Sequence, residues 1–140
     1  MEITFHSEKV DQPEIDEKEI ASWIKKVAKS YNKKVGEISY LFCGDEKILE
    51  INKQYLNHDF YTDIITFDYS EENTISGDII ISLQTVESNS QMYKTDYNEE
   101  LHRVIIHGIL HLCGLNDLTK EDERKMRNAE DKALKILFSM

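Results

Sequence analysis

The chain has 140 residues, of which 40% are hydrophobic and 31% are charged, and its formal net charge is −10. This length and composition suit a single globular domain, 1–140, with one core. No run of about 20 apolar residues is present, so we expect no membrane span, and the first residues lack the pattern of a secretory signal. Two cysteines make no disulfide framework, which favours a reducing cytoplasm. The acidic balance argues against a general nucleic-acid binder but leaves room for a metal-dependent nuclease.

Hydrophobic periodicity predicts strands and helices that alternate along the chain. The expected elements, in order, are a strand at 2–6, a helix from Ile15 to Tyr31, a strand at 37–43, a helix at 45–56, a strand at 62–69, a polar turn at 71–77, a strand at 77–82, a helix at 83–94, a helix at 98–114 and a last helix from about Thr119. We therefore expect an α/β (α+β) domain, with a small, mostly parallel mixed sheet of about four strands packed with about five helices.

The helix expected at 98–114 is apolar nearly all round, which predicts a central, buried position. It carries His107 and His111, whose spacing of four places both imidazoles on one helix face, as two ligands of one metal ion would lie. Burying two imidazoles is costly unless their nitrogens are satisfied. The alternative is a pair of core histidines hydrogen-bonded to the backbone. We favour the metal site.

The residue after the first histidine differs from that of the zinc-protease motif. Such proteases place a catalytic glutamate there, whereas this chain has Gly108. We interpret Gly108 as a residue of close helix–strand packing. A hydrolase built on this pair must then use another acid or a metal-activated water alone.

The third metal ligand depends on where the helix ends. If the helix continued straight, Asp117 would lie about 9 Å beyond His111 along the axis and could not share the ion. Gly114 suits the left-handed position that ends a helix, with Leu115 and Leu110 as the apolar pair of a Schellman motif. The chain can then turn back and bring Asp117, or the neighbouring Asn116, to the metal.

Cys113 is a competing ligand. It lies about 200° around the helix from His111 and should point away from the ion. We interpret Cys113, like Cys43 at the end of a strand, as a small buried hydrophobe. The alternative for Asp117 is an ordinary surface acid before the last helix.

The segment HGILHLCGLND at 107–117 resembles the metal motif of the YbeY family of endoribonucleases and rRNA maturation factors, His-Gly-x-Leu-His-Leu-x-Gly-Tyr-Asp-His. Four further segments fall in that family's order and spacing, so the resemblance covers the chain roughly from Ile38 to Leu137. They are INKQYL at Ile51, YTDIITF at Tyr61, SGDIII at Ser76 and MRNAEDKAL at Met126.

The resemblance implies single-strand-specific RNA cleavage in maturation of the small-subunit rRNA 3′ end and in ribosome quality control. It implies one zinc ion, held by His107, His111 and a third ligand, with no organic cofactor and no membrane partner. Asp117 stands where the family has its third histidine, so another divalent metal also suits the site. The implied partners are ribosomal RNA and the small ribosomal subunit.

A second departure concerns RNA contact. The family usually has an arginine where this chain has Leu56, and leucine cannot contact phosphate electrostatically. Lys53, His58 and Arg103 are the candidate substitutes, although each is more often an ordinary surface residue.

Asp63 and Asp78 match the family's TD and GD acids. Either can orient a water or a ligand histidine, and the alternative for both is a structural hydrogen bond.

Two other functions stay open for the chain. One is a metalloprotease-like hydrolase. The other is a non-catalytic ribosome assembly factor with a structural metal, whose fourth ligand would be Cys113 or Asn116.

Overall fold

A computed structural model describes residues 2–58 and 62–140 of the chain. Its helices and strands follow one another in the order that the sequence predicts. In chain order they are β1 (Glu2–Ser7), α1 (Glu17–Ser30), β2 (Lys34–Cys43), α2 (Asp45–Leu56), β3 (Ile64–Asp68), β4 (Thr74–Ser82), α3 (Leu83–Tyr93), α4 (Tyr97–Leu112) and α5 (Lys120–Phe138). Tyr61, the first residue of the YTDIITF segment, lies outside the described residues.

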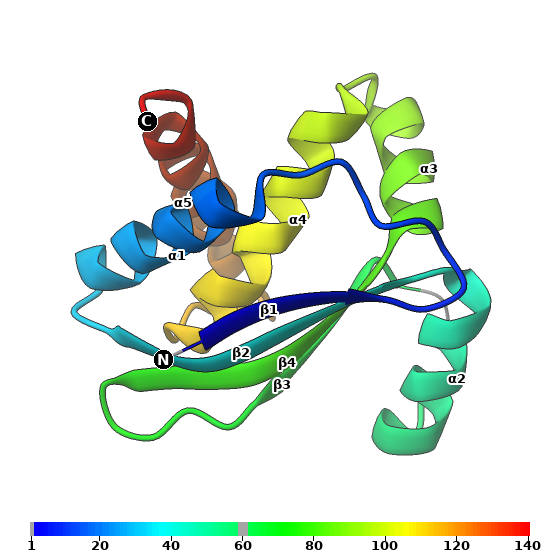
Figure 1. Cartoon of the computed structure of the whole chain (residues 1–140), viewed down its shortest axis with the longest axis horizontal. Helices are drawn as coiled ribbons and strands as arrows, with labels where there is room; N and C mark the ends of the chain where they lie inside the picture. The colour runs from blue at the N-terminus through cyan, green and yellow to red at the C-terminus, as the bar shows by residue number, and fades with distance from the viewer. Residues whose placement is uncertain (1, 59–61) are drawn as a thin grey trace.

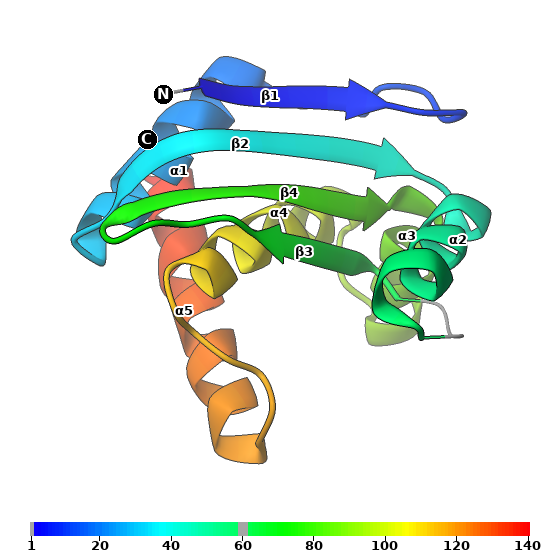
Figure 2. The same ribbon diagram turned by 90° about the horizontal axis from the view of Figure 1, so that it is seen from below.

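The four strands form one sheet in the order β1-β2-β4-β3. β1 pairs with β2 and β2 with β4 in parallel, while β3 runs antiparallel to β4 (Figure 2). The mixed, mostly parallel sheet with five helices is the single small domain that the pattern predicts. No helix in the described part of the chain has the length and apolar character needed to cross a bilayer.

Two strands begin earlier than their hydrophobic pattern indicates. β2 starts at Lys34 and β4 at Thr74, because these polar residues pair with each other across the sheet. The polar turn predicted at 71–77 is therefore wrong beyond Asn73, since the following residues belong to β4. Pairing of the backbone, which the side-chain pattern does not report, sets these boundaries.

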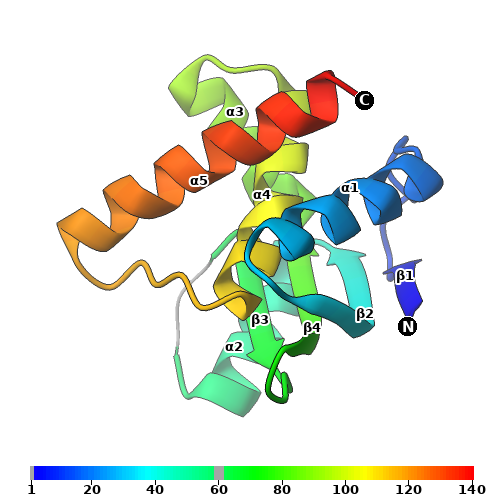
Figure 3. The same cartoon turned by 90° about the vertical axis from the view of Figure 1, so that its left-hand side faces the viewer.

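Helices cover the two faces of the sheet unequally. On one face α1, α3, α4 and α5 pack around a large core (Figures 1 and 3). α4 lies in its middle, in contact with the other three helices and with β3 and β4, which agrees with its apolar sequence. α2 packs on the opposite face over a smaller cluster that includes Ile48, Ile65 and Ile80.

Gly108 brings α4 close to the sheet. A Cβ added there would lie 2.9 Å from Cδ1 of Ile79 and 3.3 Å from Cδ1 of Ile64. These distances are shorter than normal packing contacts, so the position accommodates no side chain without movement of the strand residues. The predicted role of Gly108 in helix–strand packing is confirmed.

α4 ends in the predicted Schellman motif. Gly114 has φ of +108°, a conformation that glycine adopts without a Cβ penalty. The Leu115 N–H donates to the Leu110 carbonyl at 3.1 Å, and the Gly114 N–H donates to the His111 carbonyl at 3.0 Å. This pair of bonds stops the helix and reverses the chain. The turn directs the segment that follows back along α4.

Candidate metal and RNA site

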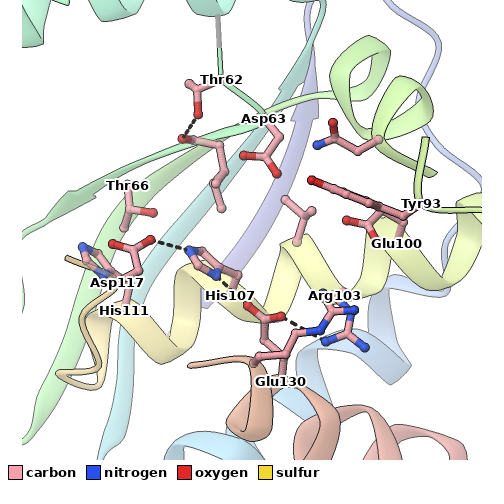
Figure 4. Close-up of a pocket in the computed structure, with 14 residues that line it drawn as sticks. Thr62, Asp63, Thr66, Tyr93, Glu100, Arg103, His107, His111, Asp117 and Glu130 are labelled. Atoms are coloured by element: carbon pink, nitrogen blue, oxygen red, sulfur yellow. Dashed lines mark hydrogen bonds and ion pairs between the residues drawn. The ribbon is translucent and has the colours of Figure 1, made fainter. Parts of the chain in front are cut away.

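A cavity of about 390 Å³ opens beside α4, where α4 meets the start of β3, the end of α3 and the middle of α5 (Figure 4). Polar side chains predominate in its wall. The lining residues are Thr62, Asp63, Ile64, Thr66, Asn89, Tyr93, Glu100, Arg103, Val104, His107, His111, Asp117, Arg127 and Glu130. All three predicted metal ligands line this one cavity.

His107 lies between two carboxylates. Its Nδ1 is 2.7 Å from Oε2 of Glu130, and its Nε2 is 3.5 Å from Oδ2 of Asp117. A hydrogen bond from Nδ1–H to Glu130 leaves Nε2 as the ring nitrogen that faces Asp117. This is the tautomer of a metal-binding histidine whose other nitrogen is held by a carboxylate.

His111 is oriented by the turn that ends its own helix. Its Nδ1 is 3.0 Å from the Leu115 carbonyl oxygen. Because the carbonyl can only accept, Nδ1 carries the proton and Nε2 keeps its lone pair. The Schellman turn thus places Asp117 beside His107 and also fixes the ring of His111.

Glu130 connects the site to a buried ion-pair network. Its Oε1 accepts a hydrogen bond from Arg103 at 3.0 Å, and the same guanidinium donates to Asp131 at 2.8 Å. The side chains of Glu130 and Arg103 are only 8% and 11% exposed, so water screens this pair weakly. Arg103 therefore holds Glu130 in the position from which Glu130 orients His107.

The pKa values of the site reflect burial and these charges. Burial alone lowers the pKa of His107, but its hydrogen bond to Glu130 and the charges of Glu130, Asp117 and Asp63 outweigh it, so the pKa is raised. Burial raises the pKa of Asp63, and the nearby His107 opposes part of this effect. Burial likewise raises the pKa of Glu100, against the attraction of Arg103 and Arg127.

The three predicted ligands do not lie close enough together to form a complete ligand set. Within residues 2–58 and 62–140, no three His, Cys, Asp or Glu side chains are close enough together to hold an ion. The pair His107–Asp117 nevertheless fits such a site. Two ligands about 2.0–2.1 Å from a tetrahedral zinc ion lie roughly 3.4 Å apart, and the Nε2–Oδ2 distance is 3.5 Å.

The other acidic candidates lie in different places. Asp63 precedes β3 and lines the cavity together with His107. Asp78 lines cavities that include neither histidine, and it accepts a hydrogen bond from the Tyr69 hydroxyl at 3.3 Å. The structure thus brings Asp63 to the site and leaves Asp78 elsewhere.

The candidate RNA-contacting residues also do not lie together. Arg103 lines the cavity but is held by Glu130 and Asp131. Lys53 and His58 do not line the cavity, and Leu56, in the place of the family arginine, ends α2 with 39% of its surface exposed.

Neither cysteine lines the cavity. Cys113 is half-buried, and Tyr31 and Lys33 are the titratable groups that interact with it electrostatically. Burial raises the pKa of both Cys43 and Cys113 to about 11. A thiol with this pKa stays protonated near neutral pH, which supports the interpretation of both residues as packing residues.

Sequence reasoning missed Glu130, Glu100, Tyr93 and Arg127. A signal for Glu130 was present, because it falls on the apolar stripe of α5, four residues from both Met126 and Leu134. A charged residue on such a stripe is seldom buried without a partner. Its partners lie on α4, more than 20 residues earlier in the chain. Hydrophobic periodicity within α5 therefore could not identify them.

Comparison with known proteins places the chain in a family. The family described as Endoribonuclease YbeY matches residues 3–137. A Parabacteroides distasonis protein named Endoribonuclease YbeY is 58% identical over 98% of this chain and 96% of its own length. The protein of that name from Bacteroides fragilis strain ATCC 25285 is 58% identical over 96% of each chain.

A solved structure agrees with the fold. A Thermotoga maritima protein determined in solution superposes with a TM-score of 0.71 at 23% identity, over 99% of this chain and 90% of its own. The identity is low, so this likeness concerns the fold alone. The match over residues 3–137 and the relatives at 58% identity lead to one assignment: the chain belongs to the YbeY endoribonuclease family.

Proposed function

We propose that this protein is a metal-dependent endoribonuclease that cleaves single-stranded RNA during maturation of the small-subunit rRNA 3′ end and in ribosome quality control. Its partners would be ribosomal RNA and the small ribosomal subunit, and it would act in the cytoplasm, where that substrate is made. Family membership supports the nuclease and the rRNA-processing role.

The observation that carries the metal part of the proposal is the orientation of the two histidines. Each bonds an oxygen through Nδ1 and keeps Nε2 for a ligand. The Asp117 carboxylate lies 3.5 Å from one of these nitrogens, and two histidines with one carboxylate suit zinc, iron and manganese. His107, His111 and Asp117 would hold the ion. Asp117 is partly exposed, so its carboxylate can rotate onto it.

A divalent ion bound there would act as a Lewis acid on the phosphodiester and would lower the pKa of water in the site. The chain's own residues then have distinct tasks. Glu130 keeps the proton on Nδ1 of His107, and the Leu115 carbonyl does the same for His111. Asp63 lines the same cavity, and it would orient the attacking water by accepting its hydrogen bond.

Substitution of His111→Ala tests this proposal. We expect the purified variant to lose its metal and its cleavage of unstructured RNA together. His102→Ala is the matched control, since His102 is on the same helix, bonds the Asn98 carbonyl and does not line the cavity. The control should keep both properties. Undiminished RNA cleavage by a His111→Ala protein shown to be metal-free would disprove the metal-dependent mechanism.

The same preparations should be assayed on casein. Gly108 packs against β4 and supplies no base, so we expect no proteolysis. Degradation of casein that depends on His111 would instead identify a metalloprotease-like hydrolase.

A further inference from the structure

The end of the cavity formed by α3 and α5 differs in composition from the end near Asp117. It contains Tyr93, the last residue of α3, which is 63% exposed, and Asn89 of the same helix. Arg127 of α5 lines the same cavity and attracts the charge of Glu100. Figure 4 shows the Tyr93 ring at this end, next to Glu100 and away from Asp117. None of these side chains has a task in holding the ion.

Arg127 is available to a substrate, whereas Arg103 is not. The Arg103 side chain is 11% exposed, and its guanidinium donates to both Glu130 and Asp131. Arg127 is exposed on α5. It makes no hydrogen bond or ion pair with another of the described residues. Its interaction with Glu100 is electrostatic attraction alone. A free guanidinium can therefore meet a ligand at this end.

The charge of the cavity favours a cation here for RNA, in addition to the proposed metal ion. Four carboxylates line it, from Asp63, Glu100, Asp117 and Glu130, against the two arginines. A phosphodiester approaching this wall is repelled unless a positive group meets it. Arginine presents a planar fork of donors that matches two phosphate oxygens. Arg127 can thus take the task that Leu56 cannot perform.

Tyr93 presents an aromatic surface in the same place. Bases of single strands stack on exposed aromatic rings irrespective of sequence, because every base has a π-face. Asn89 lies four residues before Tyr93 on α3, hence on the same helix face, and its amide can both donate to and accept from a base edge.

We propose that Tyr93 and Arg127 form a nucleotide-binding subsite beside the cleavage site. One base of single-stranded RNA stacks on Tyr93, and a flanking phosphate binds Arg127. The proposal rests on the proposed function, since it specifies how that substrate is held. It also explains how an acidic cavity accepts RNA.

The test is the affinity of the metal-loaded protein for a short, fluorescein-labelled 2′-O-methyl RNA, measured by fluorescence anisotropy at several salt concentrations. Tyr93→Ala should weaken binding roughly tenfold without changing the salt dependence, and Tyr93→Phe should bind normally. Arg127→Ala should weaken binding and make the slope of log affinity against log salt shallower by about 0.7, the value for one phosphate contact on a single strand.

Two controls match these variants in kind. Tyr55 is 64% exposed but is on α2, and Arg124 precedes Arg127 by one turn of α5; neither lines the cavity. Tyr55→Ala and Arg124→Ala should bind RNA as the wild type does. If the Tyr93 and Arg127 variants bind like these controls while the wild type cleaves RNA, the subsite is refuted and the function stands. A wild type that neither binds nor cleaves RNA refutes both.

Discussion

Removal of Glu130 perturbs the site through a residue that does not belong to the predicted ligand set. Glu130→Ala takes away the acceptor of the His107 Nδ1–H at 2.7 Å and one of two partners of Arg103. Loss of a carboxylate that orients a metal-bound histidine typically weakens metal binding 10–100-fold, or about 1.4–2.7 kcal/mol. We expect zinc affinity to fall by this amount in competition with a chelator.

The same substitution should lower stability even without metal. Breaking a buried ion pair by removing one partner costs about 3–5 kcal/mol. Because Arg103 keeps Asp131, we expect the free energy of unfolding of the metal-free protein in urea to fall by about 3 kcal/mol. Glu130→Gln keeps an oxygen acceptor for His107 and should retain more zinc affinity than Glu130→Ala.

Asp131→Asn is the matched control for this network. Asp131 bonds the same guanidinium but is 50% exposed and does not contact His107. We expect it to cost less than about 1 kcal/mol of stability and to leave zinc affinity unchanged. A folded Glu130→Ala protein that binds zinc as tightly as the wild type would refute the reasoning that Glu130 orients His107.

Three further substitutions test other parts of the account. Gly114→Ala puts a side chain on a residue with φ of +108°, and a Cβ there would meet nothing within 4 Å. The free energy of unfolding in urea should therefore fall by roughly 1–2 kcal/mol from backbone strain alone. A variant as stable as the wild type would contradict this reasoning. Gly108→Val adds bulk 2.9 Å from Ile79 and should cost about 1–3 kcal/mol in the same assay, and a stabilised variant would show that the packing relaxes freely. Asp117→His should raise zinc affinity and selectivity over manganese in competition titrations, since imidazole suits zinc better than manganese; unchanged metal preference would exclude Asp117 from the ligand set.

Local chemistry made much of the fold predictable. The Gly114 turn and the start of α5 at its N-cap Thr119 each depend on residues within a few positions of one another, and the structure contains both. The order of strands in the sheet was not predictable in this way. β4 lies between β2 and β3, and no local pattern reports which strands pair.

The residues of the candidate site likewise differ in whether local sequence could predict them. His107 and His111 could be named from their spacing on one helix, and Asp117 from the helix end that precedes it. Glu130 and Arg127 reach the cavity from α5, and Tyr93 reaches it from α3. Their proximity to α4 is a product of helix packing, which depends on the whole core rather than on local sequence. Asp63 and Asp78, equivalent as sequence candidates, lie in different cavities, because Asp63 precedes β3 whereas Asp78 lies within β4.

The central claim is that RNA cleavage depends on an ion held by His107, His111 and Asp117. Its most direct test is to remove all metal from the wild-type protein with a chelator, return zinc in measured steps, and follow RNA cleavage against the ion bound per chain. We expect no cleavage without metal, and activity that rises in proportion to occupancy up to one ion per chain. Full cleavage by the metal-free protein would contradict it.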